Sequence, residues 1–231
     1  MPTTFIAGTV RGFSGFGGPI VLLSALNFFL APTSSIPIIL CVDLLANILL
    51  LPDARHSAIR AITVPLSLGT FVSLPLGVLL VSVANPETMK HVIALCILAA
   101  ALLLLSGWRP FVREIRPAGW AVVGMLTGIV MGATSLGITA ALFLNSGPQT
   151  AAVARANFIV WVFFSDLLLL TLFIVSQGFS LHSLPAIATM APAYLIGSLL
   201  GARLTRQIPE RLMRQTILVL VGLSALARLV F

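Results

Sequence analysis

Apolar runs long enough to cross a lipid bilayer follow one another along almost the whole chain. The 231 residues are 59% hydrophobic and only 8% charged, with a mean hydropathy of +1.13, which excludes an ordinary soluble domain. A helix needs about 20 apolar residues to span the hydrocarbon core, so we predict an all-α polytopic membrane protein. Eight apolar segments can be drawn, at residues 4–30, 35–52, 62–84, 89–107, 119–145, 152–175, 184–202 and 212–230.

Glycine and hydroxyl residues interrupt the first and the fifth of these segments. Gly12–Pro19 reads GFSGFGGP, and its weaker echo Gly132–Thr139, which begins 120 positions later, reads GATSLGIT. A helix break at membrane depth must be buried in protein or line a cavity, because lipid cannot satisfy unpaired backbone groups. Paired breaks in two halves of a chain indicate the substrate site of a transporter.

A second pair of similar sequences supports an internal duplication. Asn85-Pro86-Glu87 precedes the fourth segment, and Ile208-Pro209-Glu210 precedes the eighth, at an offset of 123 positions. We therefore predict two inverted repeats, each made of one glycine-broken re-entrant hairpin and three transmembrane helices. The first repeat covers residues 1–107, the second covers 119–231, and residues 108–118 form a connecting loop.

The basic residues of the loops indicate whether the fifth segment crosses the membrane. If it re-enters, ten arginines share one side and Lys90 and Arg228 the other; if it crosses, the basic residues divide six against six. Cytoplasmic loops carry an excess of Lys and Arg, so we predict that the fifth segment re-enters and that the basic loops are cytoplasmic. The ten arginines are Arg55, Arg60, Arg109, Arg113, Arg116, Arg155, Arg203, Arg206, Arg211 and Arg214.

For the first segment the repeat is the sole argument for re-entry. A first segment that crossed would put the N-terminus inside and leave the other assignments unchanged. Small residues four apart also predict close helix packing, at Gly8/Gly12, at Gly124/Gly128/Gly132 and at Gly197/Gly201.

The run Gly12-Phe13-Ser14-Gly15-Phe16-Gly17-Gly18 resembles the motif that begins each repeat in the TauE/SafE family of sulfite and organosulfonate exporters. Pro19 stands where the family often has a further glycine, and the second copy keeps only Gly132 and Gly137, with Ser135 between them. The polar loop 53–56 and the basic loop 203–214 are also similar to the family, and the resemblance covers essentially the whole chain. It implies export of small anions such as sulfite or sulfoacetate across a bacterial inner membrane, with proton linkage as one option.

The broken helices suit an anion, because the N-terminus of a half-helix directs N–H groups and the positive end of its dipole at the cavity. Arg11 adds a forked donor that suits a sulfite or sulfonate oxygen; the alternative is that it reaches the surface near the chain end. For the glycines, the alternative is tight helix crossing alone. The predicted substrate-binding residues are Arg11, Gly12, Ser14, Gly15, Gly17, Gly18, Thr134, Ser135 and Gly137.

Two acidic residues lie deep in apolar segments, where a carboxylate is paired, protonated or a proton carrier. Asp43 shares a helix face with Asn47, four residues on, and could pair with Arg11 or release a proton during transport. Asp166 lies in the sixth segment, together with Asn157. We assign proton coupling or polar lining to Asp43, Asn47, Asn157 and Asp166, with purely structural hydrogen bonding as the alternative for each.

The other features of the sequence predict neither an enzyme nor a cofactor or metal site. The formal charge of +7 does not indicate nucleic-acid binding, because the basic residues sit in short loops. Phe158, Trp161, Phe164 and Phe173 are interpreted as packing or lipid-contact residues. The predicted partners are a small anion and the lipid bilayer, and a homo-oligomer is compatible with the sequence. The alternatives to a secondary transporter are an anion channel and a membrane scaffold or enzyme subunit.

Overall fold

The computed structural model describes residues 2–26, 32–83, 95, 116–147, 149–177 and 183–204, and the secondary structure in this part is entirely helical. Within the described residues, five helices are long and apolar enough to cross a membrane: α3, α4, α6, α8 and α9. The prediction of an all-helical, multi-pass membrane protein is confirmed. The predicted segments 89–107 and 212–230 lie outside the described residues. The helices are α1 (Pro2–Ser14), α2 (Gly17–Leu26), α3 (Pro32–Ser57), α4 (Arg60–Val83), α6 (Pro117–Thr134), α7 (Ile138–Ser146), α8 (Ala151–Gln177) and α9 (Leu184–Leu204).

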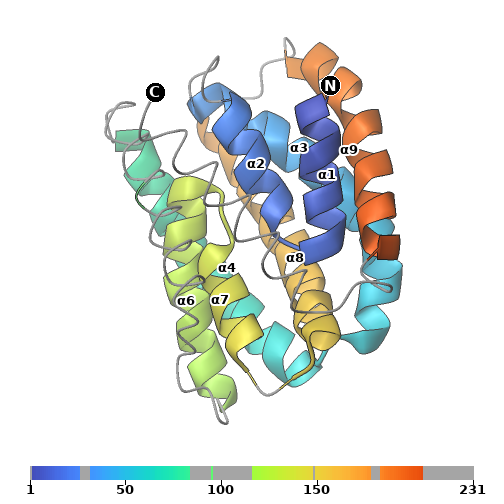
Figure 1. The fold of residues 1–231 in the computed structure, drawn as a ribbon. Helices are drawn as coiled ribbons and strands as arrows, with labels where there is room; N and C mark the ends of the chain where they lie inside the picture. Colours follow the sequence, from blue (N-terminus) through green and yellow to red (C-terminus); the bar gives the residue numbers. More distant parts are fainter. Residues whose placement is uncertain are drawn as a thin grey trace.

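Each glycine break separates two helices that run in opposite directions. In Figure 1, α1 descends from the N-terminus and α2 returns upward, whereas α6 rises from the lower end and α7 returns downward. Helices α1 and α2 have 13 and 10 residues, or roughly 20 and 15 Å at 1.5 Å per residue. Both are shorter than the hydrocarbon core of about 30 Å. The two hairpins therefore enter the bundle from opposite ends.

The long helices continue this arrangement. Helix α3 runs downward and α4 upward in Figure 1, whereas α8 runs upward and α9 downward. The lower end of the bundle thus collects the end of α3 and the starts of α4 and α6, whereas α9 ends higher, near the middle of the view. These termini carry Arg55, Arg60, Arg116 and Arg203. The re-entry of the fifth segment stays a prediction.

Two pairs of helices pack backbone against backbone. A Cβ atom at Gly12 would overlap the carbonyl of Ser198 on α9, and one at Gly128 would overlap the Ser73 hydroxyl and crowd the backbone of α4. The same close approach holds at Gly8, Gly124, Gly132, Gly197 and Gly201. The predicted role of these glycines in helix packing is confirmed: they join α1 to α9 and α6 to α4, so each hairpin is fastened to a long helix from the other half of the chain.

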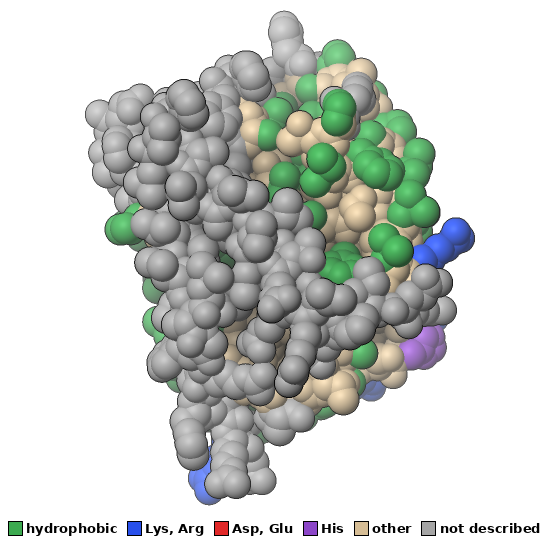
Figure 2. Space-filling model, viewed as in Figure 1, with side chains coloured by type: hydrophobic (Ala, Val, Ile, Leu, Met, Phe, Trp, Pro, Cys, Tyr) green, Lys and Arg blue, Asp and Glu red, His purple; other side chains and the backbone are tan. Residues whose placement is uncertain are grey.

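The outward faces of the helices carry large apolar side chains, as lipid contact requires. Val72 is 68% exposed on α4 and Val175 is 79% exposed on α8. In Figure 2 the described hydrophobic side chains cover the upper right of the molecule, while Lys, Arg and His side chains lie below most of them. Since the outside is apolar, the polar side chains with the most chemical interest are those in the interior.

Candidate functional site

The first break is a tight turn closed by Ser14. The Ser14 hydroxyl donates to the Val10 carbonyl at 2.7 Å and accepts from the backbone N–H groups of Phe16 at 3.2 Å and Gly17 at 2.9 Å. Gly15, with φ of +83°, has the left-handed conformation that ends α1, and its N–H donates to the Arg11 carbonyl at 2.8 Å. The hydroxyl of Ser14 therefore joins the end of α1 to the start of α2.

The second break repeats this turn 120 residues later. The Thr134 hydroxyl donates to the Val130 carbonyl at 2.7 Å and accepts from the Leu136 N–H at 3.2 Å. Ser135 occupies the left-handed position with φ of +58°, and its N–H donates to the Met131 carbonyl at 2.7 Å. Each break is thus the same αL helix ending, with one difference that matters: the left-handed residue is glycine in the first turn and serine in the second.

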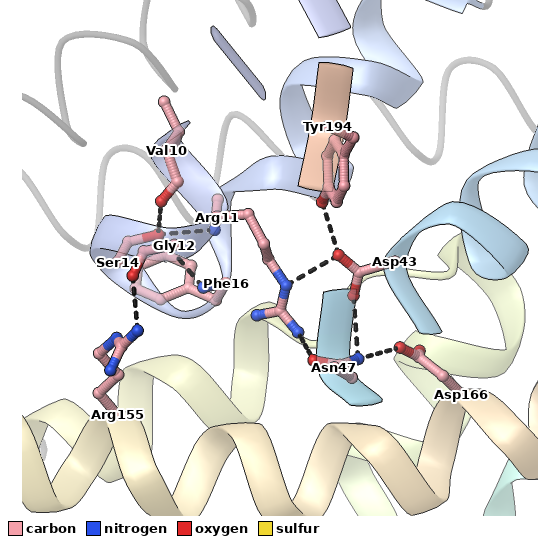
Figure 3. Close-up of polar contacts among 11 residues, drawn as sticks. Val10, Arg11, Gly12, Ser14, Phe16, Asp43, Asn47, Arg155, Asp166 and Tyr194 are labelled. Atoms are coloured by element: carbon pink, nitrogen blue, oxygen red, sulfur yellow. Dashed lines mark hydrogen bonds and ion pairs between the residues drawn. The ribbon is translucent and has the colours of Figure 1, made fainter. Parts of the chain in front are cut away.

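Arg11 lies at the centre of a fully buried polar network (Figure 3). Its Nε donates to Asp43 Oδ1 at 2.8 Å, and its Nη2 donates to Asn47 Oδ1. Asn47 Nδ2 then donates to Asp43 Oδ2 at 3.3 Å and to Asp166 Oδ2 at 3.0 Å. The Tyr194 hydroxyl donates to Asp43 Oδ1 at 2.6 Å. Four helices, α1, α3, α8 and α9, each contribute to this network, and the predicted pairing of Asp43 with Arg11 is confirmed.

A small pocket opens beside this network and lies between the two breaks. About 20 Å³ of it is open to the centre of a water molecule, which is the space that one or two waters need. Residues of the first turn and α2 line one part of it, and residues of the second turn and α7 line another. The wall is completed by Arg11, Asp43, Phe158, Val162 and Asp166. The pocket therefore lies where the two paired breaks approach each other.

Two buried polar atoms of pocket-lining residues have no hydrogen-bond partner among the described residues. They are Nη1 of Arg11 and the hydroxyl oxygen of Ser135. Buried polar groups are nearly always paired, and an unpaired one costs about 1–3 kcal/mol, more if it is charged. A cationic donor and a neutral donor on residues that line one pocket can both be satisfied by an anion.

Five of the predicted site residues line the pocket, and several others have different surroundings. Arg11, Asp43, Ser135, Gly137 and Asp166 are the five. Asn47 lies directly behind them in the polar network. The Asn157 Oδ1 accepts from the Ile59 N–H at 2.6 Å, so it braces the start of α4 instead.

The hydroxyls of Ser14 and Thr134 make hydrogen bonds to the backbone within their own turns. Gly18 lies against Tyr194, because a Cβ at Gly18 would overlap the Tyr194 hydroxyl. The carbonyl of Gly12 accepts from Arg155 Nη2 at 2.6 Å, and Arg155 also packs against Gly15. These contacts fasten the end of α1 to α8. A Cβ at Gly17 would crowd Val10 and Ser14, so this glycine allows the turn to close.

Sequence reasoning missed two residues of the site. Tyr194 joins the network from α9, and Phe158, which the pattern assigned to packing, lines the pocket with its ring centroid 5.8 Å from the Arg11 guanidinium carbon. Tyr194 is the single tyrosine of the chain. A lone tyrosine in the middle of an apolar span was the signal available for it, since a buried hydroxyl needs a partner.

Replacing Ser14 tests whether its hydroxyl serves the turn. We expect Ser14→Ala to lower the free energy of unfolding by about 0.5–2 kcal/mol, the usual cost of losing a helix-capping hydroxyl. Thr134→Val, its counterpart in the second turn, should have a similar effect. Equilibrium unfolding in detergent measures both. A Ser14→Ala variant of unchanged stability that no longer binds anions would instead support direct contact with a substrate.

The fold and the site together define a class of membrane protein. Broken half-helices that meet in the interior of a multi-pass bundle, with a buried guanidinium at the meeting point, are typical of a transporter. The chain belongs to the TauE/SafE family: the family model described as sulfite exporter TauE/SafE matches residues 1–228. No curated protein and no solved structure matches the chain. The protein is thus a multi-pass membrane transporter of the sulfite exporter family.

Proposed function

We propose that this protein is a secondary transporter that exports a small sulfur-containing anion, namely sulfite, sulfoacetate or a related organosulfonate. The observation that carries the proposal is the pair of unpartnered buried donors, Arg11 Nη1 and Ser135 Oγ, at one pocket between the two breaks. The oxygens of such an anion accept hydrogen bonds from both groups. Hydrogen bonds in which the donor or the acceptor is charged are stronger than neutral ones, so this pair of donors favours binding of an anion in the pocket.

The conformation of Ser135 supports the same role. A left-handed conformation costs an L-residue roughly 1–2 kcal/mol, and glycine stands at the equivalent position 15. Ser135 therefore bears a conformational cost while its hydroxyl has no partner among the described residues. Local strain that persists next to an unsatisfied donor is typical of a functional site.

Transport requires the pocket to change size. The space of about 20 Å³ that is open to the centre of a water molecule is too small for an anion of four or more heavy atoms, since each water needs about 10–15 Å³ on the same measure. The described form is therefore too narrow at the proposed site to hold the anion. The glycine-packed pairs α1–α9 and α4–α6 carry the two breaks, so movement of one pair relative to the other would widen the pocket and open it to one side.

The charges of the network support proton coupling. One guanidinium faces two carboxyl groups, Asp43 and Asp166, through direct contact or through Asn47. With both carboxyls ionised the network carries one net negative charge, and a bound anion would add to it in a medium of low dielectric constant. Anion binding is therefore favoured when one carboxyl holds a proton, which links transport of the anion to transport of a proton.

The matching turns support two inverted repeats. The left-handed residue, the hydroxyl that closes the turn and the glycine that follows recur at an offset of 120 residues, and the two hairpins enter from opposite ends of the bundle (Figure 1). By the positive-inside rule, the arginine-bearing end of the bundle faces the cytoplasm of a bacterial inner membrane.

Ser135→Gly is the sharpest test, because strain and binding respond in opposite directions. We expect the variant to be at least as stable as the wild type, since glycine adopts the left-handed conformation without strain. Its affinity for the transported anion should fall about 10- to 100-fold, the equivalent of the roughly 1.5–3 kcal/mol of a hydrogen bond to a charged group. Thermal shift and calorimetric titration with sulfite, sulfoacetate, taurine, sulfate, oxalate and chloride would measure both properties.

The panel also tests the proposal as a whole. A wild type that is stabilised selectively by sulfite or a sulfonate supports it, because a ligand at about 100 times its dissociation constant stabilises by about 2.7 kcal/mol. Stabilisation by a neutral or cationic ligand alone would overturn it. In proteoliposomes, accumulation of the anion against its gradient in response to a proton gradient would distinguish a coupled transporter from a channel.

A further inference from the structure

Tyr194 contributes a donor to the polar network from a helix that has no other member in it. The residue is fully buried on α9, and its hydroxyl donates to Asp43 Oδ1 at 2.6 Å. The same oxygen accepts from Arg11 Nε at 2.8 Å, and the other carboxylate oxygen accepts from Asn47 at 3.3 Å. Asp43 is therefore held by donors from three helices.

This arrangement fixes the orientation of the guanidinium. Nε of Arg11 is bound to Asp43 and Nη2 is bound to Asn47, so the planar fork cannot rotate without breaking both contacts. The one nitrogen left without a described partner is Nη1, in a side chain that lines the pocket. Because Tyr194 restrains the carboxylate against which the fork is seated, its hydroxyl also restrains the direction of Nη1.

We propose that Tyr194 is a positioning residue for anion recognition, acting through Asp43 to aim Nη1 of Arg11 into the pocket. The inference rests on the proposed function, since it assigns Tyr194 a part in binding the transported anion. It also explains Gly18, because a Cβ at that position would meet the Tyr194 hydroxyl and the Arg11 Cβ. The lack of a side chain at Gly18 leaves room for the Tyr194 hydroxyl. This packing role explains the glycine without a contact to the substrate.

The packing of α9 makes Tyr194 a link between anion binding and helix movement. Gly8 of α1 packs directly against the Tyr194 backbone, so Arg11 and Tyr194 belong to one closely packed pair of helices. Asp43 lies on α3, outside that pair. The contact between Tyr194 and Asp43 therefore spans the boundary between the α1–α9 pair and the rest of the bundle.

A double-mutant cycle distinguishes positioning from simple satisfaction of a buried carboxylate. Tyr194→Phe keeps the ring and removes the donor, and Arg11→Lys keeps the charge and removes the fork. If Tyr194 acts through the fork, Tyr194→Phe should weaken binding of sulfite and sulfoacetate about tenfold in the wild type and less than twofold in the Arg11→Lys background. A hydroxyl that only stabilises the fold would change affinity by the same factor in both backgrounds.

A spectroscopic measurement observes Tyr194 itself in the wild-type protein. Because the chain has one tyrosine, labelling with 3-fluorotyrosine places a single fluorine probe beside Asp43. We expect sulfite or sulfoacetate to shift its fluorine resonance in the wild type, and the shift to need a much higher anion concentration in Ser135→Gly. Two results would overturn the inference and leave the proposed function standing. One is a wild type that binds either anion while its fluorine resonance does not move, and the other is a Tyr194→Phe variant that binds the anions with wild-type affinity. A wild type that binds neither anion would overturn both.

Discussion

Arg11→Met is expected to destabilise the protein by about 3–5 kcal/mol and to abolish anion binding. The substitution leaves Asp43, which is 1% exposed, without the guanidinium that its carboxylate contacts at 2.8 Å. Breaking a buried ion pair by removing one partner costs this much, because the remaining charge is desolvated and uncompensated. Unfolding free energies in mixed detergent, measured beside the anion titrations, give both quantities.

A double variant separates the loss of stability from the loss of binding. Asp43→Asn keeps an oxygen that accepts from Tyr194, so Arg11→Met combined with Asp43→Asn removes both members of the ion pair. Asp166 is then the one carboxyl group of the network, and it keeps its hydrogen bond from Asn47. Replacing both members of a buried pair is often neutral, so stability should recover by at least half of the single-variant loss while binding stays absent. Arg60→Met, at an exposed arginine, is the control and should change stability by less than about 0.5 kcal/mol. Recovery of anion binding in the double variant would contradict the role assigned to Arg11.

Gly197→Val is expected to cost more than about 3 kcal/mol and to uncouple α9 from α1. A Cβ at this position would overlap the Phe5 carbonyl and crowd the backbone of Thr9, and backbone atoms cannot move aside as a side chain can. Overpacking usually costs 1–3 kcal/mol. This substitution is expected at or above the upper end of that range because the added side chain would overlap backbone atoms of the neighbouring helix. Loss of the α1–α9 packing should also remove the selective thermal shift, since Arg11 and Tyr194 sit on the two helices.

The matched control lies on the same helix. Ala188→Val introduces the same side chain at an exposed position of α9, where only the small difference in helix propensity applies. Thermal unfolding of the two variants side by side measures the difference. Equal melting temperatures would show that the α1–α9 contact does not contribute to stability as the glycine packing requires.

Much of the site could be predicted because its residues are unusual in an apolar chain. Arg11, Asp43 and Asp166 are charges that are costly in lipid, so an interior position was expected for the two acids and was one of two expectations for Arg11. All three lie in the interior. Ser135 was predicted from the paired break alone. The same reasoning treated Ser14 and Ser135 as equivalent donors, whereas the Ser14 hydroxyl closes its own turn and the Ser135 hydroxyl is left unpartnered. Sequence spacing cannot distinguish the two serines, because the difference depends on which residue of each turn adopts the left-handed conformation. Ser14 precedes the left-handed Gly15, whereas Ser135 is itself the left-handed residue.

The sequence by itself determined that the chain lies in a membrane, where its helices break and which charges must be buried. These properties are local: they follow from apolar run length, from glycine and from the cost of a charge in lipid. Only the tertiary structure decided which helices are neighbours, and so brought Tyr194 within 2.6 Å of a carboxylate 151 positions away in the chain. The physical reason is that lipid is as apolar as the helix surfaces, so hydrophobicity does not select helix partners inside the membrane. Close backbone packing at small residues and interhelical hydrogen bonds select them instead, and both depend on the whole bundle.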